Sequence, residues 1–233
     1  MMATAPSTTT AWKNGYPTSD GKPMAETDWH RDLMNALIQT LKVWYAAQRR
    51  VYVSGNLLLY YEPGNRRRHV SPDVFVVKGI ASHDRPNYLL WEERKAPDVV
   101  IELTSSSTRR EDVEDKYHLY QDTLRVKEYF LFDPLGDYLD PPLQGHRLRR
   151  GQYQPIRLVA DRLPSQVLRL HLERNGRELR LFDPAASRWL PTPLERAAAA
   201  EVALQDAEAE NERLRRELAD LRRHLPNNHD ATS

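Results

Sequence analysis

Glu102 stands near the end of an apolar run, PDVVIEL at positions 97–103. β-Branched and aliphatic residues after a proline are typical of a strand that is covered on both faces. An ionised carboxylate is costly in such a strand unless a cation lies beside it, or unless its proton stays on. The other interpretation is a strand-end glutamate that turns to solvent or caps the TSSST turn that follows. The neighbours of Glu102 in space must decide between the two.

A second carboxylate, Asp73, begins the preceding predicted strand, directly after Ser71-Pro72. If the two strands are neighbours, Asp73 and Glu102 converge at one end of the sheet, where two carboxylates without a cation would repel. Carboxylate and carbonyl oxygens are the ligands that Mg²⁺ prefers, and this ion keeps several waters for a substrate phosphate. We therefore expect a site for Mg²⁺, with Mn²⁺ as a substitute, at Asp73, Glu102 and the main-chain carbonyl of Leu103.

Length and composition restrict the functional classes. A chain of 233 residues can form one domain of ordinary size plus an appendage. Its 34 basic and 33 acidic residues give a net charge of +1, so any surface that binds nucleic acid must be local. The absence of cysteine excludes disulfides and thiolate metal sites. No segment approaches the roughly 20 apolar residues of a membrane span, and we expect a cytoplasmic protein without membrane contact.

Hydrophobic periodicity predicts the elements that position these carboxylates. An amphipathic helix is expected from Thr27 or Asp28 to about Arg49. Strand-like runs follow, and the helical pattern between the last two predicts a parallel crossover. The runs are residues 51–61, 73–77, 98–103 and 128–134. We predict an α/β (α+β) domain at residues 26–192, with a mixed central sheet flanked by helices, after a flexible arm at residues 1–25.

Residues 193–226 differ in composition, with abundant Ala, Glu, Leu and Arg and no glycine. With Asn211 at position a of a heptad, Leu or Ala occupies the neighbouring a and d positions, as in a coiled coil. Glu210 and Glu217 then lie at g, and Arg215 and Arg222 at e, where they can pair between parallel helices. We expect a homodimer through residues 196–225 and a disordered tail at 227–233. The alternative is a single amphipathic helix docked on its own domain.

An ordered set of motifs across four elements resembles the Uma2 endonuclease family, within the PD-(D/E)xK nuclease superfamily. The motifs are Ser71-Pro72-Asp73 to Val77, Ala96-Pro97-Asp98 to Leu103 with Ser105 to Arg110, Asp115-Lys116-Tyr117 to Tyr120, and Lys127-Glu128-Tyr129 to Pro134. The resemblance covers about residues 26–160 and implies a restriction-endonuclease-like core and DNA as the substrate. We assign the family's first acid to Asp73, because Asp98 shares a strand with Glu102. Asp98 is then expected to support the site or to open the strand.

The chain departs from the simplest superfamily pattern at Thr104, where a lysine would follow the second acid by two residues. Uma2-like proteins are similar in carrying this lysine on the next helix, and Lys116 is the matching residue. The resemblance implies that Lys116 orients the attacking water or stabilises charge on the phosphate. The alternative is a solvent-facing lysine paired with Asp112. His30 matches a histidine of the family's first helix, and it is expected near the metal waters or a phosphate, or in a structural role.

Basic runs beside the motifs are candidate DNA contacts. Arg66-Arg67-Arg68-His69 precedes Asp73 on a predicted loop, and Arg109 and Arg110 lie beside the turn after Glu102. The sequence thus predicts a metal-dependent endonuclease that hydrolyses DNA phosphodiester bonds. One alternative is a catalytically silent nuclease-fold module that binds nucleic acid or protein and dimerises through its C-terminal coil. Another is an acid/base hydrolase that uses the paired carboxylates without metal.

Overall fold

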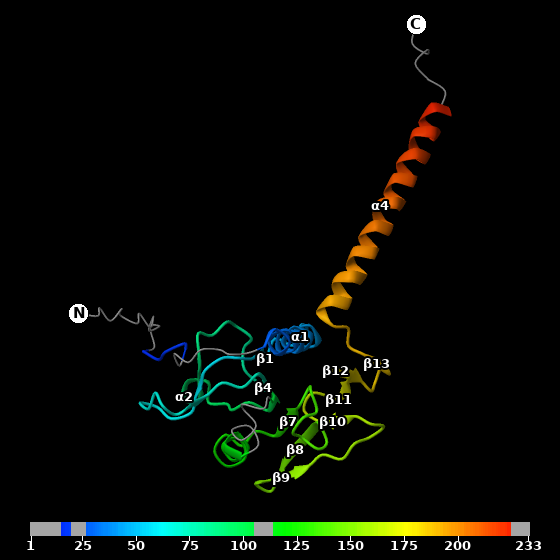
Figure 1. Ribbon diagram of the computed structural model, residues 1–233. Coiled ribbons are helices and arrows are strands. Elements are labelled where there is room, and N and C mark those ends of the chain that lie inside the picture. Colours follow the sequence, from blue (N-terminus) through cyan, green and yellow to red (C-terminus); the bar gives the residue numbers. More distant parts are fainter. Residues whose placement is uncertain (1–14, 20–26, 105–113, 225–233) are drawn as a thin grey trace, which may run out of the picture. The chain divides into compact units, whose positions relative to one another are not determined.

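The computed structural model describes residues 15–19, 27–104 and 114–224, and the chain divides into two compact units. The first unit is residues 1–190 and the second is residues 191–233. The first unit combines helices with a six-stranded mixed sheet and two smaller sheets, and the second contains a long helix (Figure 1). These elements confirm the predicted α+β fold class.

The six-stranded sheet has the order β1-β4-β6-β7-β8-β9. β6 and β7 pair in parallel and all other neighbours in this sheet are antiparallel. Between β6 and β7 the chain forms α3 (Lys116–His118) and the π-helical segment η2 (Leu119–Thr123), which confirms the predicted parallel crossover. The strands are β1 (Val51–Ser54), β4 (Val74–Lys78), β6 (Val99–Leu103), β7 (Glu128–Phe132), β8 (Leu143–Arg149) and β9 (Gln152–Pro155).

Both faces of this sheet are covered by other elements. On one face, α1 (Asp28–Trp44) and a four-stranded antiparallel sheet share a hydrophobic cluster with alternate residues of β6. On the other face, η2 packs through Tyr120 against Val100 and Tyr129. All five residues of β6 are buried, which explains why the strand is apolar except at Glu102. The four-stranded sheet consists of β10 (Leu163–Ser165), β11 (Leu170–Asn175), β12 (Glu178–Asp183) and β13 (Arg188–Trp189).

The helix α1 begins where the sequence predicts and ends earlier. Thr27 is the N-cap, and its side chain accepts a hydrogen bond from the His30 N–H at 3.4 Å. The helix stops at Trp44 instead of about Arg49. Residues 46–50 are all exposed, so no apolar face holds them in a helix. The chain turns there and enters β1.

The predicted strand 51–61 is in fact two strands separated by a turn at Gly55. A Cβ atom at Gly55 would lie 1.9 Å from the main-chain oxygen of Asp73, so only glycine allows this close approach. Asn56 follows with a positive φ of 47° and donates its N–H to the Pro72 carbonyl at 2.8 Å. The turn therefore fixes the backbone directly before β4.

After the turn the chain enters a three-stranded sheet of order β3-β2-β5, which anchors part of the N-terminal arm. The ring of Tyr16 lies 4.9 Å from that of Tyr60 and 5.1 Å from that of Trp91. The Tyr60 hydroxyl donates to the Pro17 carbonyl at 2.9 Å. Tyr16 and Pro17 therefore contact the domain within the arm that composition predicts to be flexible, because Tyr60 and Trp91 supply aromatic partners. The strands are β2 (Leu59–Tyr60), β3 (His69–Val70) and β5 (Tyr88–Leu89), and the short helix α2 (Leu90–Glu93) follows.

Asp133 organises the loop after β7 at the end of the sheet. Its buried carboxylate accepts four main-chain N–H bonds of 2.9–3.1 Å, from residues 135, 136, 138 and 139. Burial alone would raise the pKa of Asp133, but these four donors outweigh that effect and lower it. The ionised carboxylate therefore stabilises this loop.

We expect Asp133→Asn to lower the free energy of unfolding at pH 7 by about 2–3 kcal/mol, because an amide cannot accept all four bonds. Urea denaturation measures this loss, and Asp137→Asn, at an exposed position in the same loop, is the matched control. The folded-state pKa lies below the unfolded value of about 3.9, so the stabilisation is fully present above pH 4. The difference between wild type and Asp133→Asn should shrink as the pH falls through the lowered pKa. A difference that is the same at pH 7 and pH 3 would contradict this role.

The second unit contains α4 (Pro193–His224), a helix of 32 residues. A capping box begins it: the Glu195 N–H donates to Thr192 Oγ1 at 3.2 Å, and the Thr192 N–H donates to Glu195 Oε2 at 2.7 Å. Its seam leucines Leu204, Leu214, Leu218 and Leu221 are 44–64% exposed. Within the described residues, no helix is both long and apolar enough for a membrane span.

Candidate active site

Asp73 and Glu102 lie together at one end of the six-stranded sheet. β4 and β6 are antiparallel neighbours with Val74 opposite Ile101, so the start of β4 meets the end of β6. The Asp73 N–H donates to Glu102 Oε2 at 3.2 Å, and the Leu103 N–H donates to Asp73 Oδ2 at 2.7 Å. Glu102 is 0% exposed, so the interpretation of a glutamate turned to solvent is wrong.

Lys116 reaches this pair from the helix that follows β6. Its Nζ lies 3.1 Å from Glu102 Oε2, and its side chain is only 12% exposed. The alternative of a solvent-facing lysine is therefore wrong. The ammonium is the cation that a buried glutamate needs, and it is also available beside the site for chemistry on an anion.

His30 approaches from α1, which packs on the opposite face of the sheet. Its Nε2 lies 3.5 Å from Asp73 Oδ1, and both side chains are largely buried. Burial alone would raise the pKa of Asp73. The imidazole of His30, the charge of Lys116 and the Leu103 N–H together outweigh that effect and lower the pKa. Asp73 is therefore ionised at neutral pH.

Tyr120, the last residue of the motif that begins at Asp115, is a member of the cluster that the sequence analysis does not assign to the site. Its hydroxyl donates to Glu102 Oε1 at 2.6 Å, and both side chains are 0% exposed. Burial raises the pKa of Tyr120 well above its usual value, so the hydroxyl keeps its proton. The signal that could have found it is the spacing of four residues from Lys116, which brings the two side chains to one side of a helix.

Thr104 and Asp98 have hydrogen-bond partners other than Asp73 and Glu102. Thr104, at the position of the superfamily's usual lysine, is 0% exposed and its hydroxyl lies 3.1 Å from that of Tyr138. Asp98 lies just before β6, at the opposite end of the strand from Glu102. Its carboxylate accepts from the Lys78 N–H at 2.7 Å and pairs with Lys127 at 2.7 Å. These contacts fit the strand-opening role, one of the two that the sequence leaves open for Asp98.

The structure describes two of the four candidate DNA contacts. Arg67 and Arg68 lie exposed in the hairpin that connects β2 to β3. Arg68 pairs with Glu62 at 3.3 Å and lies over the ring of Tyr61. Arg109 and Arg110 are outside the residues that the structure describes.

The donor set at this end of the sheet fits a hard divalent cation. Asp73 and Glu102 offer carboxylate oxygens, and the Leu103 carbonyl belongs to the same strand end. Among the residues that the structure describes, no group of three or more histidine or carboxylate side chains could hold one ion. Mg²⁺ suits such a sparse set, because it is commonly held by one or two carboxylates and keeps several waters.

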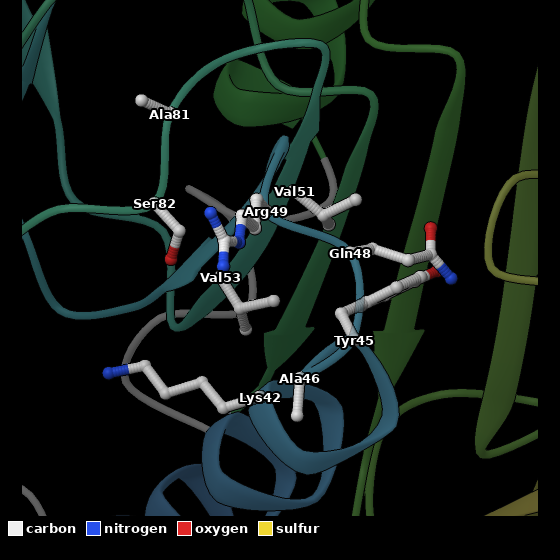
Figure 2. Close-up of a pocket in the computed structure, with 9 residues that line it drawn as sticks. All are labelled: Lys42, Tyr45, Ala46, Gln48, Arg49, Val51, Val53, Ala81 and Ser82. Carbon is white, nitrogen blue, oxygen red and sulfur yellow. The ribbon is translucent and has the colours of Figure 1, made fainter.

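A cavity of about 510 Å³ lies at the C-terminal end of α1, and Figure 2 shows the residues that line it. Lys42 and Tyr45 line it at the C-terminal end of α1, whereas His30 lies in the first turn of that helix. Val51 lines it from β1, where it is paired with Lys78 at the far end of β4 from Asp73. The cavity is therefore not part of the carboxylate site. Its other lining residues are Ala46, Gln48, Arg49, Val53, Ala81 and Ser82.

Comparisons with known proteins give a family. The family model Uma2, described as "Putative restriction endonuclease", matches residues 13–181, well over half of the chain. A solved structure, described as a putative nuclease belonging to DUF820 from Anabaena variabilis ATCC 29413, is 18% identical with a TM-score of 0.47. That similarity covers 65% of this chain and 80% of the other. No curated protein matches the chain.

Proposed function

The chain belongs to the Uma2 family of restriction endonuclease-like proteins, and from this premise we propose that it is a metal-dependent endonuclease that hydrolyses DNA phosphodiester bonds. The family match confirms the resemblance seen in the motifs and supports a nuclease. Metal dependence and a DNA substrate are the further steps of the proposal. The observation that carries it is the convergence of Asp73, Glu102 and Lys116 at one sheet end.

The acidic pair supplies the binding part of the proposed chemistry. Asp73 and Glu102, with the Leu103 carbonyl, would hold Mg²⁺ or Mn²⁺, which supplies an acidified water and neutralises phosphate charge when bound. The main chain fixes the two carboxylates relative to each other. The Asp73 N–H donates to Glu102, and the N–H of Leu103, the residue after Glu102, donates to Asp73. Their positions therefore do not depend on flexible side chains alone.

Lys116 and His30 supply the remaining polar groups of the proposed mechanism. The ammonium of Lys116 can orient the attacking water or stabilise negative charge that develops on the phosphate. His30 holds Asp73 from the α1 side and can accept or donate a proton at its imidazole. Arg67, Arg68, Arg109 and Arg110 are proposed to contact the DNA backbone, which positions the duplex without reading its sequence.

A cleavage assay tests the proposed function. Purified protein is incubated with plasmid, linear and single-stranded DNA in Mg²⁺ or Mn²⁺, with excess EDTA in a parallel series and Glu102→Ala as the inactive control. We expect products only in the presence of the metal and intact Glu102. DNA binding without cleavage under every condition would favour the silent nuclease-fold module instead, although such a module has no need for Lys116 beside two carboxylates.

We also propose that α4 pairs with α4 of a second copy as a parallel coiled coil over residues 196–225. The charges of the helix support this arrangement. On the outer positions, Arg216 pairs with Glu212 at 2.5 Å, and Arg223 pairs with Asp220. Arg215 and Arg222, at e, have no ion-pair partner in the described part of the chain. In a parallel dimer, Glu210 and Glu217 of the partner helix would face them. Within their own helix, these two glutamates pair with Arg213 at 2.7 and 3.6 Å.

We expect Arg215→Glu combined with Arg222→Glu to weaken the dimer on the order of tenfold to a hundredfold. The reversal places like charges at all four g–e′ contacts, and each such contact contributes a few tenths to about 1 kcal/mol. Sedimentation velocity over a dilution series measures the dissociation constant. The matched control is Arg216→Glu combined with Arg223→Glu, which makes the same charge change on the outer face. A monomeric wild type at micromolar concentration, or equal weakening by both double variants, would contradict the coiled coil.

A further inference from the structure

The carboxylate of Glu102 is held at both of its oxygens by one short helical segment. Lys116 on α3 lies 3.1 Å from Oε2, and the Tyr120 hydroxyl donates to Oε1 at 2.6 Å. The two residues are four positions apart across the junction between α3 and η2. π-Helical segments frequently occur at functional sites, where they change the direction in which side chains project.

The ring and the hydroxyl of Tyr120 have different roles. The ring lies in a buried cluster with Val100, Leu124 and Tyr129, and its centroid is 5.0 Å from that of Tyr129 in an edge-on arrangement. A phenylalanine would fill the same space. The hydroxyl is thus the part of the side chain that packing alone does not require, and its acceptor is the acid at the end of β6.

We propose that Tyr120 is a positioning residue that fixes the rotation of the Glu102 carboxylate and so prepares it to bind a divalent cation. This inference rests on the proposed function, because it assigns Glu102 as a metal ligand. A hydrogen bond to a carboxylate is charge-assisted and short, so it sets the plane of the acceptor. Tyr120 has only two rotatable side-chain bonds and its ring is packed on all sides. Its hydroxyl therefore moves little and restricts the rotation of the Glu102 carboxylate.

Calorimetric titration of the metal-free protein with Mn²⁺ tests the positioning role without an activity measurement. We expect Tyr120→Phe to weaken Mn²⁺ binding about 10- to 100-fold, the usual effect of removing a hydrogen bond to a metal ligand. The matched control is Tyr153→Phe, which removes another buried hydroxyl, one that donates to the Val126 carbonyl at 3.0 Å. Its Mn²⁺ affinity should equal that of wild type. Circular dichroism melting confirms that each variant is folded at the titration temperature.

A third variant carries 4-aminophenylalanine at position 120, which keeps the ring and restores a weaker donor. Its affinity should fall between wild type and Tyr120→Phe, and it decides the question alone if the phenylalanine variant does not fold. Wild-type affinity in a folded Tyr120→Phe, or equal weakening in Tyr153→Phe, would overturn the positioning role and leave the proposed function intact. Wild-type protein that does not bind Mn²⁺ would overturn both.

Discussion

Asp73→Asn and Glu102→Gln should each reduce divalent-ion-dependent DNA cleavage by on the order of a thousandfold or more. Each change removes one of the two carboxylates that meet at the end of β4 and β6 and replaces it with a neutral amide. A bound cation contributes several kcal/mol of charge stabilisation to phosphodiester hydrolysis, and each 1.36 kcal/mol corresponds to a tenfold change in rate. Initial rates of plasmid nicking, with wild type and each variant at equal concentration, measure the loss.

The control for these two variants is Asp84→Asn, which neutralises an exposed carboxylate in the loop between β4 and β5. It should cleave at the wild-type rate. Circular dichroism must show the wild-type fold in both site variants, since an unfolded protein would also be inactive. Wild-type cleavage that persists in excess EDTA would contradict the metal-dependent mechanism. Full activity in either site variant would show that its carboxylate is not required for cleavage.

Lys116→Met should lower turnover about a hundredfold or more while Mn²⁺ binding survives. Methionine keeps the length of the side chain and most of the helix propensity, and it removes only the ammonium beside Glu102. Loss of one group that stabilises charge in the transition state typically costs 10²–10³ in rate. Single-turnover cleavage with enzyme in excess over DNA separates this chemical loss from weaker substrate binding.

The matched control for this variant is Lys42→Met, which removes an exposed lysine from α1 at the cavity side of the domain. Both variants lose one positive charge, so a general electrostatic effect on DNA binding would appear in both. We expect Lys42→Met to keep the wild-type turnover. Full activity in Lys116→Met would show that the displaced lysine is not the family's catalytic lysine in this chain.

Much of the frame around the site follows from the sequence alone. The apolar run ending at Glu102 predicts a buried strand, and all residues of β6 are buried. The helical pattern between the last two strand-like runs predicts a parallel crossover, and β6 and β7 pair in parallel. Local signals also predict the start of α1 at Thr27 or Asp28, and the helix begins at Asp28 with Thr27 as its N-cap. These predictions hold because strand burial, crossover topology and capping depend on residue types within one short segment.

The tertiary structure decided which polar residues meet. Period-two alternation puts Asp98 and Glu102 on one face of a strand, but it does not say which residues surround each of them. Asp98 contacts Lys78 and Lys127. Glu102 contacts Asp73 and Lys116. Gly55 breaks a strand-like run because the Asp73 backbone, distant in sequence, passes too close for any side chain. Tyr120 resembles a core aromatic until the crossover sets its hydroxyl against Glu102. Each of these contacts joins segments that are separate in the sequence, so only the packing of those segments against one another determines it.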